Sequence, residues 1–165
     1  MLRAFFCRSL LLALLLILPL SAAAQDRPSP EEARRFLEFY YNGEGVVLAE
    51  VQICTEVPRE GERQYECVGE VAPDAVQTGT NYALRMVYVV PQDVDEETII
   101  VQYNRGGVTR EVDEVTVSGS IRYRTWTQFN LRQPGAWQFQ ILRDAGDDVE
   151  TLHTLDVQAS AGPEE

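Results

Sequence analysis

The side chains that could carry out catalysis are few and scattered in this chain. His153 is the single histidine, in the segment Thr-Leu-His-Thr-Leu near the C-terminus. A Ser-His-Asp or Cys-His arrangement needs that imidazole beside a nucleophile, and the sequence contains no Gly-x-Ser-x-Gly motif. All 14 basic residues are arginines, which excludes lysine chemistry such as Schiff-base formation. We therefore predict no catalytic residue and no enzymatic activity.

Cys54 and Cys67 are predicted to form a structural disulfide. The third cysteine, Cys7, lies in an N-terminal segment that we expect to be removed, which leaves an even pair. If residues 60–61, Glu-Gly, form the turn of a tight β-hairpin, the two cysteines face each other at a non-hydrogen-bonded position, where Cα atoms approach to about 4.5 Å. Their spacing is far from Cys-x-x-Cys and no histidine is nearby, which argues against a redox-active or metal-binding pair.

Two acidic loops are candidates for metal binding, because Ca²⁺ is bound by oxygen-rich loops. Their members are Asp93, Asp95, Glu96 and Glu97 in one loop and Asp144, Asp147, Asp148 and Glu150 in the other. Neither loop matches Asp-x-Asp-x-Asp-Gly with a distal Glu, and the second is typical of a hairpin turn, in which Asp and Gly supply the turn conformation. We predict no cofactor and weak or no metal binding by these loops, with a calcium site as the alternative.

The best candidate for a binding surface is the alternating row Arg122, Arg124 and Trp126. Successive outward side chains on a strand lie about 7 Å apart, since each residue rises about 3.3 Å. Arginine beside tryptophan can stack on the ring and can also bind carboxylates with two hydrogen bonds. Such a row is suited to an acidic partner peptide or a sugar. The alternative, which the abundance of acidic residues favours, is an intramolecular ladder against an acidic strand such as the one that contains residues 111–114.

The first 24 residues have the three parts of a signal peptide. Arg3 and Arg8 give a basic start, residues 10–20 form an apolar run of 11 residues, and residues 21–24 are Ser-Ala-Ala-Ala. A membrane span needs about 20 apolar residues, so we expect export to the periplasm or the extracellular space, with cleavage after residue 24. Gln25 stands where a lipid-anchored protein would have cysteine. A retained N-terminal anchor is the alternative.

The charge of the chain restricts its partners. Removal of residues 1–24 takes away two arginines and changes the net charge from −12 to −14. Such a surface repels phosphate backbones, so nucleic-acid binding is disfavoured, and anionic lipid headgroups are disfavoured for the same reason. We expect another envelope protein or a small ligand as the partner, and no membrane insertion after signal cleavage.

Residues 25–45 are predicted to form a polar lead-in and one helix. Ser29 is a suitable N-cap, Pro30 suits the first helical position, and Glu32 completes a capping box. Apolar residues recur at helical spacing over residues 33–41 and form one face, which we expect to pack on the domain. Asn42-Gly43 ends the helix.

From residue 46 to residue 158 the pattern is that of β-strands. The segments are rich in Val, Ile, Tyr, Thr and Trp, many alternate apolar with polar residues, and turn residues separate them. They are residues 46–57, 64–71, 82–90, 98–104, 108–117, 120–131, 136–143 and 149–157. Seven or eight short strands after one helix predict an all-β fold, a two-layer antiparallel, Ig-like β-sandwich. Residues 159–165 are predicted to be a disordered acidic tail.

Two motifs carry a resemblance to a known family. They are Tyr-Arg-Thr-Trp-Thr over residues 123–127 and Pro-Gly-Ala-Trp-Gln-Phe over residues 134–139. Over residues 82–157 the chain resembles a small bacterial exported β-sandwich domain family of unknown function, number two-nine-one-four in the usual series. Members often have an Arg-Thr-Trp-Ser-like strand and an Asp-Gly turn, where this chain has Thr127 and Ala145-Gly146. The resemblance implies an exported accessory β-domain and supplies no catalytic residue.

Three functions follow from these observations. The first is a binding or accessory module of the cell envelope, with the row of Arg122, Arg124 and Trp126 as its contact face. The second is a small-molecule or carbohydrate carrier, which needs a cavity lined by residues such as Tyr82, Tyr88, Trp126 and Trp137. The third and weakest is an enzyme that uses a pair of Asp or Glu side chains.

Overall fold

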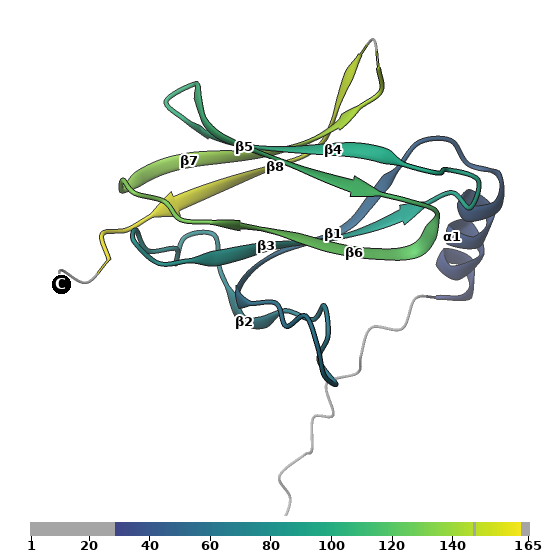
Figure 1. Ribbon diagram of the computed structural model, residues 1–165, viewed down its shortest axis with the longest axis horizontal. Helices are drawn as coiled ribbons and strands as arrows, with labels where there is room; N and C mark the ends of the chain where they lie inside the picture. Colours follow the sequence, from purple (N-terminus) through teal and green to yellow (C-terminus); the bar gives the residue numbers. More distant parts are fainter. Residues whose placement is uncertain (1–28, 147, 163–165) are drawn as a thin grey trace, which may run out of the picture.

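Two four-stranded antiparallel sheets, packed face to face, form the body of the protein in the computed structural model (Figure 1). The structure describes residues 29–146 and 148–162, so the predicted signal peptide and the last residues of the predicted tail lie outside the described part. The strand orders are β2-β1-β3-β6 in the first sheet and β5-β4-β7-β8 in the second. The strands are β1 (Val47–Glu56), β2 (Val68–Val71), β3 (Tyr82–Val90), β4 (Glu97–Arg105), β5 (Val108–Val117), β6 (Ser120–Phe129), β7 (Gly135–Asp144) and β8 (Val149–Ala159). The predicted two-layer, Ig-like β-sandwich is confirmed.

The core lies between the two sheets. Every residue of β3 is buried, because the strand is central in its sheet and both of its faces are covered. Across the core, the rings of Phe129 and Tyr103 meet the ring of Phe139 edge to face, with centroids 4.9 and 4.8 Å apart. Burying a side chain of this size contributes about 1.5–3 kcal/mol. This aromatic cluster holds the first sheet, through β6, against β4 and β7 of the second.

The connection between β5 and β6 crosses from one sheet to the other. It consists of residues 118–119, and it passes so close to the loop after β3 that a Cβ on Gly119 would lie 2.8 Å from the carbonyl oxygen of Gln92. The Gly119 N–H donates to the carbonyl of Val94 at 2.9 Å. Strands β5 and β6, although consecutive in the sequence, therefore lie in different sheets and do not pair with each other.

Helix α1 (Pro30–Asn42) lies at one end of the sandwich (Figure 1). The predicted capping box is confirmed: the Glu32 N–H donates to the Ser29 hydroxyl at 3.2 Å, and the Ser29 N–H donates to the Glu32 carboxylate at 2.8 Å. The helix contacts β3 and β6, but none of its residues is buried. No helix of the described residues is long and apolar enough to cross a membrane.

The predicted disulfide between Cys54 and Cys67 is present, with Cα atoms 5.4 Å apart. The predicted hairpin register is wrong, because Cys54 pairs with Glu70 and β2 begins only at Val68. Residues 57–67 form a loop instead, in which Tyr65 adopts a φ of 60° and its N–H donates to the Pro58 carbonyl at 2.9 Å. Because Tyr65 has this left-handed conformation, the loop does not continue as a strand paired with β1. Cys67, at the end of the loop, forms the disulfide with Cys54.

Candidate functional site

The predicted row of Arg122, Arg124 and Trp126 lies on the outer face of β6. Strand β6 is an edge of the first sheet and pairs only with β3 among the described residues. In this register Arg124 lies opposite Val87, and Trp126 lies opposite Arg85. Because side chains alternate along a strand, the three predicted residues share the side of β6 that faces away from the second sheet. The alternation of the sequence therefore predicted their common face correctly.

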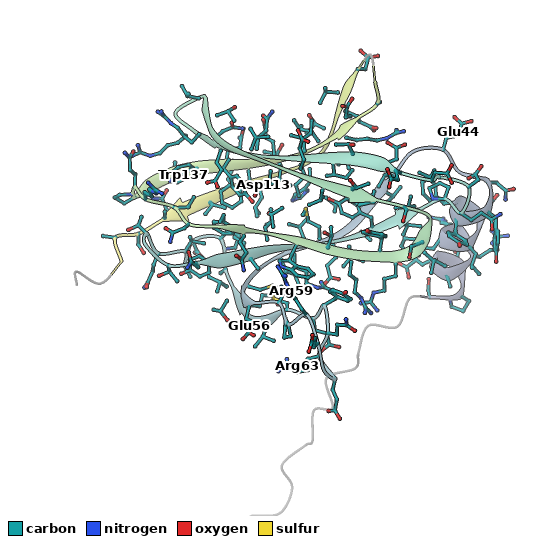
Figure 2. The ribbon with its side chains drawn as sticks, in the orientation of Figure 1. Glu44, Glu56, Arg59, Arg63, Asp113 and Trp137 are labelled. Carbon is teal, nitrogen blue, oxygen red and sulfur yellow. A yellow bond between two sulfur atoms is a disulfide. The ribbon has the colours of Figure 1, made fainter. Side chains whose placement is uncertain are left out.

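Trp126 is half-buried under the disulfide loop. Its ring centroid lies 5.5 Å from that of Tyr65, and the guanidinium carbon of Arg59 lies 5.7 Å from the same centroid. The indole also packs against the small cluster around Cys54 and Cys67. Figure 2 shows Arg59 below the first sheet, on the opposite side of the molecule from Trp137 in the second. Trp126 thus fixes the loop to β6, and only part of its ring is left for a partner.

Arg85 supports this face and was not singled out from the sequence. Its side chain is 5 % exposed, and its Nη1 lies 3.1 Å from the carboxylate of Glu50. The same nitrogen donates to the Gln52 side-chain oxygen at 2.8 Å, and Nε donates to the Tyr65 carbonyl at 2.8 Å. A single charged residue within the apolar segment Ala-Leu-Arg-Met-Val was the available signal. Arg85 connects β1, β3 and the disulfide loop beneath Trp126.

Arg122 and Arg124 have no such partners in the described part of the chain. No carboxylate lies within 4.0 Å of either guanidinium, and the buried Nε of Arg124 has no hydrogen-bond partner. The predicted alternative, a ladder against the strand with residues 111–114, is wrong. That strand is β5, which the crossing connection places in the other sheet.

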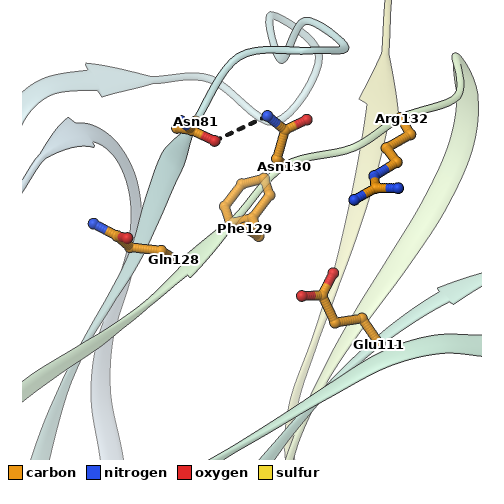
Figure 3. A pocket seen from close by; sticks show the side chains of 6 residues that line it. All are labelled: Asn81, Glu111, Gln128, Phe129, Asn130 and Arg132. Carbon is orange, nitrogen blue, oxygen red and sulfur yellow. Dashed lines mark hydrogen bonds between the residues drawn. The ribbon is translucent and has the colours of Figure 1, made fainter.

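A polar hollow of about 340 Å³ opens between β5 and the end of β6. Figure 3 shows its lining residues, which are Asn81, Glu111, Gln128, Phe129, Asn130 and Arg132. The Asn130 amide donates to the Asn81 side-chain oxygen at 2.9 Å and to the Gly79 carbonyl at 3.1 Å. Glu111 and Arg132 both line the opening without forming an ion pair. The hollow therefore offers separate groups of opposite charge beside the edge of β6.

The four aromatic residues proposed for a carrier cavity do not share one. Tyr88 is fully buried in the core, and burial raises the pKa of its hydroxyl. Trp137 lies in the second sheet, where its Nε1 donates to the Gln133 carbonyl at 3.0 Å. Tyr82 and Trp126 line a hollow of about 250 Å³ on the outer face of the first sheet, beside the disulfide loop. The prediction of that cavity is wrong because alternation sends these rings to different sides of the two sheets.

The other predicted candidates lie apart from this face. His153 is exposed on β8. Glu97 and Glu150, one from each acidic cluster, both bind Arg143, at 2.7 and 3.4 Å. Hydrogen bonds that the Arg143 guanidinium donates to the Glu97 carboxylate raise the pKa of that guanidinium. Within residues 29–146 and 148–162, no three His, Cys, Asp or Glu side chains converge to hold a metal ion.

Comparison with known proteins concerns the fold. No protein-family model and no curated protein matches the sequence. The chain is similar to the crystal structure of the CARDB domain of the PF1109 protein in complex with di-metal ions from Pyrococcus furiosus, at 13% identity and a TM-score of 0.42, over 73% of this chain and 91% of that one. The solution NMR structure of the same domain aligns at 16% identity and a TM-score of 0.35, over 70% and 96%. The sheet topology itself defines the chain as an Ig-like β-sandwich, and the family resemblance stays a prediction.

Proposed function

We propose that the protein is an exported, non-catalytic β-sandwich that acts as a binding or accessory module of the cell envelope. Its contact surface is the outer face of β6 around Arg122 and Arg124. One observation carries this proposal: neither arginine has a carboxylate partner in the described residues, although the whole chain has 26 acidic residues and a net charge of −12.

The guanidinium groups of Arg122 and Arg124 have unused hydrogen-bonding capacity. A guanidinium presents five N–H donors and binds carboxylates with two parallel hydrogen bonds, which are stronger than bonds between neutral groups. Arg124 is half-buried, and its Nε is buried without a partner. Charges in such positions are screened less by salt than fully exposed ones. A partner with carboxylates on a complementary surface would gain bonds from Arg122 and from the terminal nitrogens of Arg124, at little further cost of ordering β6, which already pairs with β3.

The binding experiment uses charge reversal on this face with a matched control. R122E and R124E, singly and together, are immobilised beside the wild type and challenged with envelope extracts after mild cross-linking. R110E is the control, because Arg110 is an exposed arginine on another edge strand, β5, which belongs to the second sheet. We expect the face variants to lose captured partners at least tenfold, and R110E to retain them. Equal capture by the folded double variant would refute this contact face.

Export is part of the proposal, supported by the signal-peptide pattern and by the disulfide, since disulfides persist in oxidising compartments. The full-length precursor, expressed in a bacterial host, is expected in the periplasmic or secreted fraction. Intact-mass analysis should show a chain that begins at Gln25 and lacks two hydrogen atoms because of the bridge between Cys54 and Cys67. A full-length or reduced cytoplasmic product would overturn the assignment.

A small polar ligand such as a sugar is the second candidate function. The observation that favours it is the hollow of Figure 3, where Glu111 and Arg132 lie beside three side-chain amides without pairing with each other. Hydroxyl groups of a sugar could accept from Arg132 and donate to Glu111. Saturation-transfer NMR with neutral oligosaccharides distinguishes the two functions. Signals that disappear in R132A but persist in R122E/R124E would favour the carrier over the protein-binding module.

A further inference from the structure

We propose that the open edge of β6 binds an extended acidic segment of a partner protein as an added β-strand. The inference rests on the proposed function, because it uses the same two arginines. It goes further by stating the conformation of the partner and the backbone groups that hold it. Three features of the molecule support it: the differences among the four sheet edges, the unpaired backbone groups of β6, and the side chains on the two sides of that edge.

The four edge strands differ in charge, length and cover. Strand β2 has four residues and one glutamate, whereas β5 and β8 each have a net charge of −2. The end of β8 is also covered, because the Gln158 N–H donates to the Pro73 carbonyl at 3.0 Å and the Ser160 N–H donates to the Val76 carbonyl at 2.9 Å. Strand β6 has ten residues, two arginines and no acidic residue. Among the described edge strands, β6 is the one that is both long and positively charged.

Only half of the backbone N–H and C=O groups of β6 are directed toward another strand of the sheet. Its register with β3 extends from Phe129 opposite Tyr82 to Ser120 opposite Val90. In an antiparallel strand the N–H and C=O groups of alternate residues point to opposite edges, so half of these groups point away from β3. No described strand pairs with them. The connection at Gly119 closes one end, where the Arg122 N–H donates to the Ser120 hydroxyl at 3.2 Å. Residues 123–129 therefore form the stretch that an added strand would pair with.

The side chains beside this edge select the partner. An added strand would lie about 4.8 Å from β6, within reach of the long side chains of Arg122 and Arg124. Its outward side chains should therefore be Asp or Glu. Its inward side chains would point toward the hollow that contains Glu111 and Arg132. Because that hollow has both charges, it suits small uncharged polar side chains such as Thr or Ser.

A second copy of the chain is a poorer occupant of this edge. Two β6 edges would bring arginines against arginines, and like charges directly opposite each other destabilise a strand pair. Charged residues on an edge also protect it from aggregation, and this protection acts mainly against basic or apolar strands. An acidic strand reverses the sign of the interaction, so the same arginines that exclude other partners would attract it.

The test uses synthetic peptides with alternating Glu and Thr, blocked at both ends, and the oxidised mature chain. Two further peptides bear backbone N-methyl groups on the Glu residues or on the Thr residues. Because alternate amides of a strand point to opposite edges, one methylated peptide blocks the edge toward β6 and the other leaves it free. Affinity is measured by calorimetry, and amide chemical shifts of β6 are followed by NMR.

We expect one N-methylated peptide to bind at least tenfold more weakly than the other, with shifts on alternate amides over residues 123–129. R122E/R124E should bind the unmethylated peptide at least tenfold more weakly, R110E should bind it normally, and a Lys-Thr peptide should not bind. Equal affinity of both methylated peptides would overturn strand addition while leaving the arginine face intact. Binding unaffected by R122E/R124E would overturn the proposed function itself. Absence of peptide binding at millimolar concentration, or self-association through β6, would also overturn the inference.

Discussion

Strands β5 and β6 occupy equivalent positions but have opposite properties. Both have ten residues, both are sheet edges, and two residues connect them. Strand β5 has three acidic residues, and most of its side chains are exposed, whereas β6 has two arginines and most of its side chains are half-buried or buried. Edge position alone therefore does not determine the properties of a strand. The support behind the strand and the sign of its charge distinguish the two.

The two strands also differ in what lies beneath them. On β5, Glu111 and Asp113 lie opposite Tyr103 and Val101 of β4, so they share the side of the sheet that faces β6. Inward-pointing charges of this kind protect an edge from pairing. Outside β6, in contrast, the disulfide loop, Trp126 and Arg85 pack together. Strand β5 is thus protected by charge, and β6 is held rigid by packing.

The largest expected effect comes from removing the disulfide that holds the β6 face. C54A/C67A should lower the free energy of unfolding by about 3 kcal/mol, the value expected for a loop of this length. Urea denaturation followed by Trp126 and Trp137 fluorescence measures it. The control is the wild type in reductant, which should reach a similar stability. A variant as stable as the oxidised wild type would show that packing alone holds the loop.

The next effect concerns Arg85. R85M keeps most of the side-chain volume but leaves the Tyr65 carbonyl and the Gln52 amide oxygen without their donor. Removing one member of a buried ion pair costs about 3–5 kcal/mol. We expect about 2 kcal/mol here, because Glu50 is 39 % exposed and can be solvated. R110M on β5 is the matched control and should change stability by less than about 0.5 kcal/mol. Equal effects at both sites would remove the distinction between the two strands.

Sequence alternation was sufficient for most of the fold but not for the loop that supports the site. The predicted strands 82–90 and 108–117 coincide with β3 and β5, because each has a continuous β pattern between turn residues. Strand β2 was predicted four residues too early. Its true start depends on the φ of Tyr65 and on the contact of that ring with Trp126. Contacts between residues so distant in the sequence leave no periodic signal.

The same limit applies to the candidate site. The row of Arg122, Arg124 and Trp126 was visible because its members alternate on one strand. The sequence predicted Arg85 only as part of a strand. It does not show that a loop covers this outward position of a central strand, where Arg85 is buried. The lack of partners for Arg122 and Arg124 depends on the crossing between β5 and β6, which strand patterns alone do not specify.

A smaller effect is expected where the two strands are connected through the core. The Tyr103 hydroxyl lies 2.6 Å from the Thr127 hydroxyl of β6 and donates to the Asp113 carboxylate of β5 at 3.3 Å. Burial raises the pKa of Tyr103, so it remains a neutral donor. Y103F leaves a buried Thr127 hydroxyl without its partner and should cost about 1.5 kcal/mol. In a double-mutant cycle, T127V should cost much less in the Y103F background than in the wild type. Strict additivity would show that the contact contributes nothing.

The smallest effect lies at the helix that contacts β6. S29A removes the N-cap hydroxyl and should cost about 1 kcal/mol, seen as faster hydrogen exchange in α1 with unchanged exchange in β5.

The effect of Glu32 depends on pH, because hydrogen bonds with Ser29 hold the pKa of its carboxyl below the ordinary value of 4.5. A lowered folded-state pKa means that this contribution is present above pH 4.5 and is lost as the pH falls through the folded-state value. E32Q and the wild type should therefore differ in stability at pH 7 and converge once the pH is below the folded-state pKa of Glu32. If the difference persisted at the acid end of the titration, the ionised carboxylate would not be the group that stabilises this end of α1.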